Sequence, residues 1–187
     1  MLKFYFWKIN KAMKLILSHN TELKRKQAIA IADKYREGSP VDEVFKTIAV
    51  KYALYISERS DAFKLIKYKG QQLWTEKAIN HFIKNGIKGL RHEHVIPRKL
   101  IEQEILDNKD KSKERIFTVL DKLLHAVIVT KEEAAFIDIK YKSSIPVEFQ
   151  ISNRVDYLLS RYKESNINVF YIESGDPKNF VEKIKVI

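Results

Sequence analysis

The sequence predicts an α+β fold that is predominantly helical and contains a small β-hairpin followed by a helix. The 187 residues include only five glycines and four prolines, so few positions interrupt long elements. Several stretches place apolar residues at helical spacing between recognisable helix ends. Two short runs, residues 90–97 and 125–129, are instead rich in residues that favour strands. A chain of this length is expected to form one domain.

The N-terminal part of the chain is expected to be helical. Residues 22–38 carry apolar residues at helical spacing and end at Gly38, a residue that commonly terminates helices. Residues 39–56 open on a Ser-Pro pair that suits a helix N-terminus. The two helices are predicted to form a hairpin with a tight turn between them. Residues 61–74 fit either two short strands or a helix followed by a loop.

The second part of the chain alternates helices with short strands. A helix over residues 75–86 has Thr75 as its cap and Gly86 as its stop. The strand of residues 90–97 is closed by Pro97, which can begin the next helix. The remaining predicted elements are helices over 98–108 and 113–124, a strand over 125–129, a helix from 130, a helix over 153–165 and a strand over 167–174.

The positive charge is concentrated near the N-terminus. The net charge is +11, and residues 1–70 hold 15 Lys and Arg against 7 Asp and Glu, whereas residues 131–187 hold 9 of each. We therefore divide the chain into a basic helical region, residues 1–74, and a core with a C-terminal helix and strand, residues 75–187, expected to be parts of one domain. The charge favours a polyanionic partner such as nucleic acid. A solvated basic surface without a ligand is the alternative.

Composition excludes several classes of protein. The chain has no cysteine, so disulfides and thiolate metal sites are excluded, and any metal must bind to His, Asp, Glu or water. No apolar run approaches the roughly 18 residues that span a membrane. The apolar N-terminal stretch is broken by lysines and has no signal-peptide cleavage site. We expect a cytoplasmic protein.

Glu93 and His94 form the most suggestive pair of residues in the chain. They lie near the end of a predicted strand, shortly before Pro97. A carboxylate can bind a hard divalent cation, and a neutral imidazole can accept a proton from an attacking water near pH 7. Neighbouring side chains on a regular strand point to opposite faces, so both can serve one site only where the strand ends or kinks. The pair suits metal-assisted phosphodiester hydrolysis.

The stretch "EHVIP" resembles the first half of the motif of the HNH, or ββα-metal, endonuclease family. That half is an acid-His pair, two mostly apolar residues and a proline. The second half is a strand that runs directly into a helix, which "HAVIVTKEEAAFI" resembles. The resemblance covers roughly residues 90–137. It implies that His94 is the general base, that Glu93 binds a divalent ion, with Mg²⁺ or Mn²⁺ preferred over Zn²⁺ or Ni²⁺, and that the hairpin and helix have the ββα-metal arrangement.

The chain departs from the family pattern in its second half. No asparagine that would orient the base histidine lies near the second strand, and the helix lacks the final His or Asn. Glu132 or Glu133 would have to replace it. The stretch between the halves, residues 98–124, is long and helical where many family members have a short loop. An inactive nucleic-acid-binding protein of the same fold therefore stays open.

Three further residues near the motif could each belong to the active site or have an ordinary structural role. His92 shares a strand face with His94 if the strand is regular, so it is a candidate metal ligand or a flanking residue. Glu133 is a candidate metal ligand, but it also follows Thr130 by three residues, as a capping box requires. His125 begins the second strand and either faces His94 or lies in the core.

Basic residues are the candidates for nucleic-acid contacts. Arg98 and Lys99 follow the motif at a helix start and either clamp substrate phosphates or remain solvated. Lys24, Arg25 and Lys26 form a basic run in the most positive region, and we favour it for contacts to the nucleic-acid backbone.

The sequence therefore predicts a metal-dependent endonuclease that hydrolyses phosphodiester bonds, with DNA favoured over RNA. One alternative is a catalytically inactive nucleic-acid-binding protein. Another is a protein-interaction component of a defence or toxin system, in which the neutral C-terminal part contacts the partner. Restriction, phage-defence and mobile-element roles all suit a small basic protein of this kind. The oligomeric state stays open, and a homodimer is one possibility.

Overall fold

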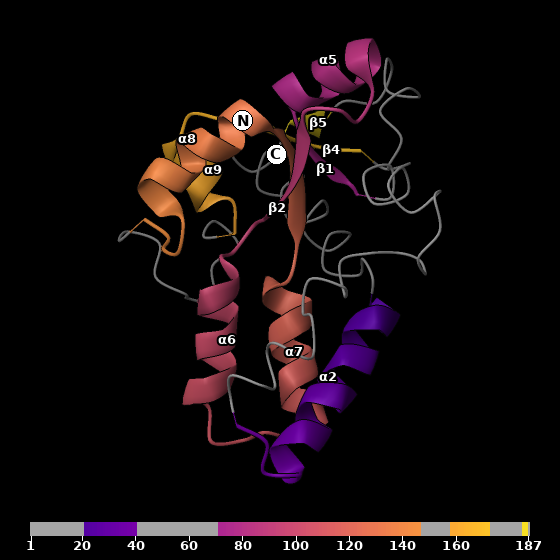
Figure 1. The fold of residues 1–187 in the computed structure, drawn as a ribbon, viewed down its shortest axis with the longest axis vertical. Coiled ribbons are helices and arrows are strands. Elements are labelled where there is room, and N and C mark those ends of the chain that lie inside the picture. Colours follow the sequence, from indigo (N-terminus) through magenta and orange to yellow (C-terminus); the bar gives the residue numbers. More distant parts are fainter. Residues whose placement is uncertain (1–20, 41–70, 147–157, 173–184, 187) are drawn as a thin grey trace, which may run out of the picture.

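The computed structural model describes residues 21–40, 71–146, 158–172 and 185–186 of the chain (Figure 1). These residues form six helices and one five-stranded sheet, so the protein is of the mixed α+β kind, as predicted. The helices are α2 (Thr21–Arg36), α5 (Glu76–Asn85), α6 (Arg98–Asp107), α7 (Lys113–Leu123), α8 (Lys131–Tyr141) and α9 (Ser160–Glu164). The strands are β1 (Leu73–Thr75), β2 (Leu90–His94), β3 (Ala126–Thr130), β4 (Val169–Tyr171) and β5 (Lys185–Val186).

The two predicted strands of the motif pair with each other at one side of the sheet. The strand order is β2-β3-β1-β4-β5, and β2 pairs antiparallel with β3 over its whole length, from Leu90 opposite Thr130 to His94 opposite Ala126. β1 runs parallel to β3, and the remaining pairs are antiparallel. Within the described part of the chain, β2 is therefore an edge strand. The sheet is larger than the predicted hairpin because β1 and β4 also join it.

The two faces of the sheet are covered by different helices. α5 covers one face, where Leu90, Trp74 and Ile128 form an apolar cluster with residues of that helix. α8 and α9 contribute to the core on the opposite face, whose strand residues are Leu73, Val127, Val129, Val169 and Tyr171. Each strand residue points to the face opposite that of its neighbour. The register therefore assigns His92 and His94 to the α5 face, and Arg91 and Glu93 to the face of α8 and α9.

A group of three helices lies below the sheet in Figure 1. The chain leaves β2 into α6, returns through α7 into β3, and α2 packs against α7. The apolar residues of these helices belong to the same core as the α8 face of the sheet. The sequence regions 1–74 and 75–187 therefore share one core, and residue 74 itself lies within β1.

The helix ends follow the predicted capping residues in most cases. Thr75 caps α5 by accepting a hydrogen bond from the Ala78 N–H, and Gly86 ends it with a φ of 68°. Pro97 is the exception, because it is the N-cap of α6 rather than its first residue, and it provides no side-chain cap. The expected helix over 39–56 lies, beyond Pro40, outside the described residues. No helix in the described ranges is both long and apolar enough to cross a membrane.

Candidate active site

β2 stays regular through the acid-His pair. His94 still pairs with Ala126, and the Val95 N–H continues the ladder by donating to the His125 carbonyl oxygen at 2.9 Å. β2 ends at His94, as expected from Pro97, but it does not kink at the pair, so the side chains of Glu93 and His94 point to opposite faces. Because β2 is an edge strand among the described residues, a ligand along its outer side could still meet groups from both faces.

Glu93 faces a buried arginine that comes from a distant part of the chain. Arg161, on α9, is 1% exposed, and its Nη1 and Nη2 atoms both lie 3.4 Å from Glu93 Oε1. Nη1 also donates to the His94 carbonyl oxygen at 3.0 Å. Charge-assisted hydrogen bonds are usually about 2.7–2.9 Å long. The guanidinium thus holds the backbone of His94 more closely than it holds the Glu93 carboxylate.

A second acid and a second arginine share this face. The Asp138 carboxylate of α8 lies 3.7 Å from the Arg91 guanidinium of β2. Burial raises the pKa of the Glu93 carboxyl above its ordinary value of 4.5, and nearby Asp138 adds to the rise while Arg161 and Arg91 oppose it. The positive neighbours of Glu93 therefore offset only part of the free-energy cost of burying its ionised carboxylate, and we call this carboxylate incompletely compensated. Acids of this kind are enriched at functional sites, although ion-pair networks of purely structural role also produce them.

Two buried polar atoms next to Glu93 have no hydrogen-bond partner among the residues that the structure describes. They are the hydroxyl of Tyr162, which is fully buried, and the Nε atom of the neighbouring Arg161. Burial raises the pKa of Tyr162 well above its ordinary value, and the charge of Glu93 acts in the same direction. Buried polar atoms usually find a partner in the protein or in bound water. The face at Glu93 therefore carries polar atoms whose hydrogen-bonding capacity is not fully used by the described residues, within an otherwise apolar core.

His94 and His92 lie together on the other face of β2. Their ring centroids are 6.5 Å apart, with the ring planes at 86° to each other. Both side chains are half-buried. The predicted metal role of His92 requires it to join Glu93, and the structure does not bring the two side chains to one face. His92 is therefore a neighbour of His94 rather than a partner of Glu93.

Glu133 has a structural role that accounts for its carboxylate. Its Oε2 atom accepts hydrogen bonds from the Thr75 hydroxyl at 2.6 Å and from the Thr130 N–H at 3.0 Å. The Thr130 hydroxyl accepts from the Glu133 N–H, which completes the predicted capping box. Thr130 pairs with Leu90, at the end of β2 away from His94. The structure thus separates Glu133 and the exposed Glu132 from the acid-His pair, contrary to the metal role predicted for them.

The basic run of α2 does not form the predicted nucleic-acid contact as a unit. Lys24 is 1% exposed, and its ammonium donates to the Asp121 backbone carbonyl at 3.3 Å and lies 3.6 Å from the Asp121 carboxylate. Burial lowers the pKa of Lys24 to about 8. The prediction for Lys24 is wrong because this side chain packs between α2 and α7. Arg25 is exposed and lies over the Phe117 ring at 4.6 Å, and Lys26 is exposed.

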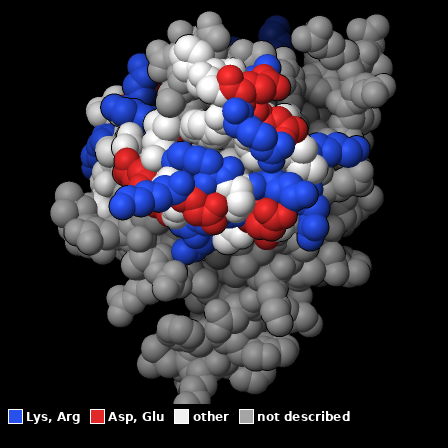
Figure 2. Space-filling view, turned by 90° about the horizontal axis from the view of Figure 1, so that it is seen from below, with Lys and Arg blue, Asp and Glu red and all other residues white. Residues whose placement is uncertain are grey.

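The lower helices do not present a surface of one charge. Figure 2 looks at the molecule from below and shows Lys and Arg interspersed with Asp and Glu on the described surface. Arg98 and Lys99, the other predicted nucleic-acid contacts, lie at the start of α6 and are exposed. Arg98 forms an ion pair with Glu102 at 2.8 Å.

Sequence reasoning missed Asp138 and Arg161. Asp138 could have been found, because Ala134, Ile137 and Asp138 fall at helical spacing and place an acid on the side of α8 that faces the sheet. Arg161 lies among the apolar residues of "DYLLSRY", a stretch whose apolar stripe predicted core packing. A lone arginine in such a stripe signals a buried charge that needs a partner.

Comparison with protein-family models, with curated proteins and with solved structures found no match to this chain.

Proposed function

We propose that this chain is a metal-dependent endonuclease of the ββα-metal type that hydrolyses phosphodiester bonds in DNA. The observation that carries the proposal is the end of β2. There an incompletely compensated carboxylate, Glu93, adjoins His94 on an edge strand, and the antiparallel partner β3 runs directly into α8, which packs on both strands. Apart from α6 and α7, which lie between the two strands in the sequence, this order of strand, strand and helix is the one that the resemblance to the HNH family implies.

The residues on the Glu93 face fit a magnesium-like ion better than a zinc-like one. Mg²⁺ is commonly held by one or two protein carboxylates, with water and substrate phosphate completing its shell. Glu93 and Asp138 are two carboxylates on this face, and both Arg161 contacts use Glu93 Oε1, so that among the described residues Oε2 is left for a ligand. Zinc needs three or four protein ligands, and no group of that size occurs in the described ranges. Mg²⁺ or Mn²⁺ is therefore favoured over Zn²⁺ or Ni²⁺.

The roles of the chain's own residues follow from their places. Glu93 and Asp138 would hold the ion, which when bound neutralises charge on the scissile phosphate. His94 accepts a proton from the attacking water, and the bond from Arg161 to its carbonyl oxygen fixes the backbone that carries the ring. Arg98 and Lys99, four and five residues further on, bind the phosphates that flank the scissile bond.

The test is cleavage of supercoiled plasmid DNA by the full chain in Mg²⁺ and in Mn²⁺. The variant His94→Ala should lose about 10²- to 10⁴-fold in rate, as expected for loss of a general base, while its affinity for DNA stays near that of the wild type. His92→Ala is the matched control, because His92 lies on the same strand face and has no role in the proposal. Undiminished cleavage by His94→Ala would refute the assignment of the base.

A metal-independent nucleic-acid-binding protein is the second candidate. One observation favours it: the two acids of this face, Glu93 and Asp138, already have two arginines, Arg161 and Arg91, as positive neighbours. EDTA separates the candidates. DNA binding that ignores EDTA, together with no cleavage in any divalent metal, supports the second candidate. Cleavage that EDTA abolishes supports the endonuclease.

A further inference from the structure

We infer that a nucleic-acid backbone lies along the outer side of β2, on a line of basic side chains that we call the β2 track. The β2 track comprises Lys88, Arg91, Arg98, Lys99 and Lys142. It deepens the proposed function, because it names the surface on which the substrate of that site lies. Two of its members, Arg98 and Lys99, are sequence candidates, and the other three come from the fold.

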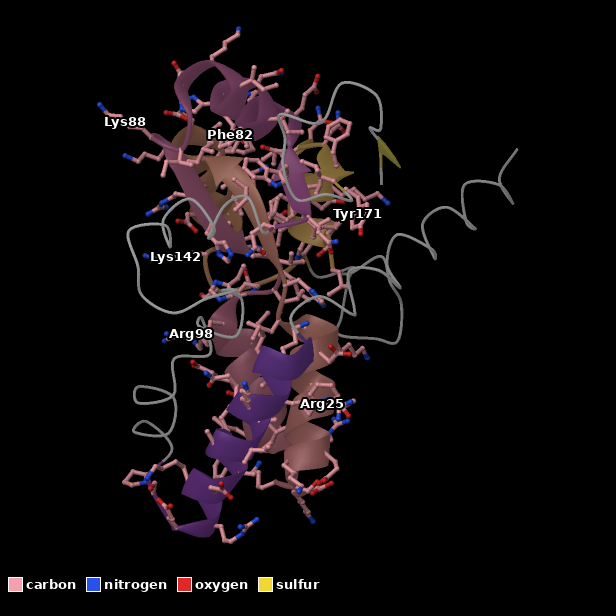
Figure 3. The ribbon with its side chains drawn as sticks, turned by 90° about the vertical axis from the view of Figure 1, so that its right-hand side faces the viewer. Arg25, Phe82, Lys88, Arg98, Lys142 and Tyr171 are labelled. Carbon is pink, nitrogen blue, oxygen red and sulfur yellow. The ribbon has the colours of Figure 1, made fainter. Side chains whose placement is uncertain are left out.

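Three separate elements bring these residues to one side of the molecule. Lys88 precedes β2 by two residues, Arg91 belongs to β2, and Arg98 begins the helix that follows it. Lys142 follows Asp138 by one helical turn, so it lies on the side of α8 from which Asp138 reaches Arg91. Figure 3 shows Lys88, Lys142 and Arg98 along the same side of the molecule, one below another, and Arg25 away from them.

The lysines of the β2 track are available to a ligand. Lys88, Lys99 and Lys142 are all exposed, and none of them forms an ion pair with any residue in the described ranges. Other basic residues of those ranges are paired: Lys34 and Arg36 form ion pairs with acids at the end of α2, and Arg115 pairs with Glu104 of α6. Unpaired lysines on one line raise the local positive potential and attract an extended polyanion.

The start of α6 adds to the attraction. α6 has no side-chain cap and no acid in its first turn, so nothing in the helix itself offsets the positive end of its dipole there. The five residues of β2 span about 16 Å at about 3.3 Å per residue, and the basic groups continue beyond both ends. A DNA duplex has one charge per about 1.7 Å of its axis, so several phosphates can meet the β2 track at once. The end of β2, with His94, lies between Lys88 and Arg98.

The test uses the full chain, a fluorescent duplex of about 20 base pairs and EDTA, with binding followed by anisotropy between about 50 and 200 mM salt. The track variant replaces Lys88, Lys99 and Lys142 with Gln. The control variant replaces Lys77, Lys109 and Lys113 with Gln, which changes the net charge equally at exposed positions elsewhere. Because all six lysines are exposed, both variants should fold, and thermal unfolding checks that they do.

The track variant should bind the duplex about a hundredfold more weakly at about 0.1 M salt, and the slope of log affinity against log salt should fall by about 2.7. The control variant should keep nearly all of the slope. Equal losses in the two variants would overturn the inference, as would a wild type that binds only anionic phosphatidylserine vesicles. Track-dependent binding without cleavage in any metal would leave the inference standing and refute the endonuclease, so the two proposals fail separately.

Discussion

Two largely buried glutamates beside the same sheet, Glu133 and Glu93, show how hydrogen bonding separates a structural acid from a candidate catalytic one. Glu133 is 6% exposed, and its carboxylate accepts short hydrogen bonds from Thr75 and Thr130 that tie the starts of α5 and α8 together. Glu93 is also largely buried, yet its contacts to Arg161 are 3.4 Å long and its pKa is raised.

The difference lies in what each carboxylate gains from its neighbours. Hydrogen bonds to a carboxylate stabilise its ionised form and offset the cost of burial. Glu133 has them, and its place is explained without any ligand. Glu93 retains part of that cost, and within the described part of the chain Tyr162 and Arg161 next to it have polar atoms without a partner. A site that binds a ligand must leave some polar capacity unused, and the Glu93 face does so.

Removing the partner of Glu93 should have the largest effect on stability. Arg161→Met leaves the Glu93 charge without its closest cation and should lower the free energy of unfolding by about 3 kcal/mol at pH 7, since breaking one side of a buried pair costs about 3–5 kcal/mol. The pKa of Glu93 is already above 4.5 and rises further in the variant. When the pKa of an acid is raised in the folded state, the free energy of unfolding of the protein falls as pH rises through the interval from 4.5 to that raised value.

The deficit of Arg161→Met should therefore shrink when urea unfolding is repeated near the lower end of that interval. Arg161→Lys is the control, because it keeps a positive charge and should lose less. A deficit that is the same at both pH values would mean that Arg161 acts by packing rather than as the counter-ion of Glu93.

Removing the structural acid, Glu133, should lower the stability by a smaller amount and should leave cleavage unchanged. Glu133→Ala leaves the Thr75 hydroxyl and the Thr130 N–H without their acceptor and should cost about 2 kcal/mol in the free energy of unfolding. Cleavage per folded molecule should stay at the wild-type level. If circular dichroism shows that the variant is folded and the variant nevertheless loses cleavage, Glu133 has a functional role like that of Glu93, and the distinction between them is wrong.

The helix ends and the β2–β3 pair could be predicted from the sequence because their signals are local. Thr75, Gly86 and Thr130 cap or end their helices through residues within one turn. Arg161 could not be matched with Glu93, because the two lie 68 positions apart and no local pattern in either segment indicates which distant residue it contacts. β4 lies within the strand predicted over residues 167–174, but the sequence does not identify the strands that pair with it, and the three residues of β1 carry too little pattern to be assigned to a sheet.

Lys24 shows why a charge run is weak evidence for a ligand. In sequence it belongs to a basic run, but Lys24, Ala28 and Ile31 fall on one helical stripe, and all three are buried. The exposed lysines of the β2 track form no run, and only the fold aligns them. The basic surface that we propose for nucleic acid is therefore formed by tertiary structure and not by a run in the sequence.

The variant Glu93→Gln tests the central claim most directly, in parallel measurements of thermal unfolding and of plasmid cleavage in Mg²⁺ at neutral pH. Gln keeps an oxygen that faces Arg161 and removes the charge whose burial raises the pKa of Glu93, so the melting temperature should equal or exceed that of the wild type. Cleavage should fall at least about 10²-fold, because a neutral amide is a poor ligand for a hard cation. A Glu93→Gln variant that cleaves like the wild type, or that unfolds at a lower temperature, would contradict the account.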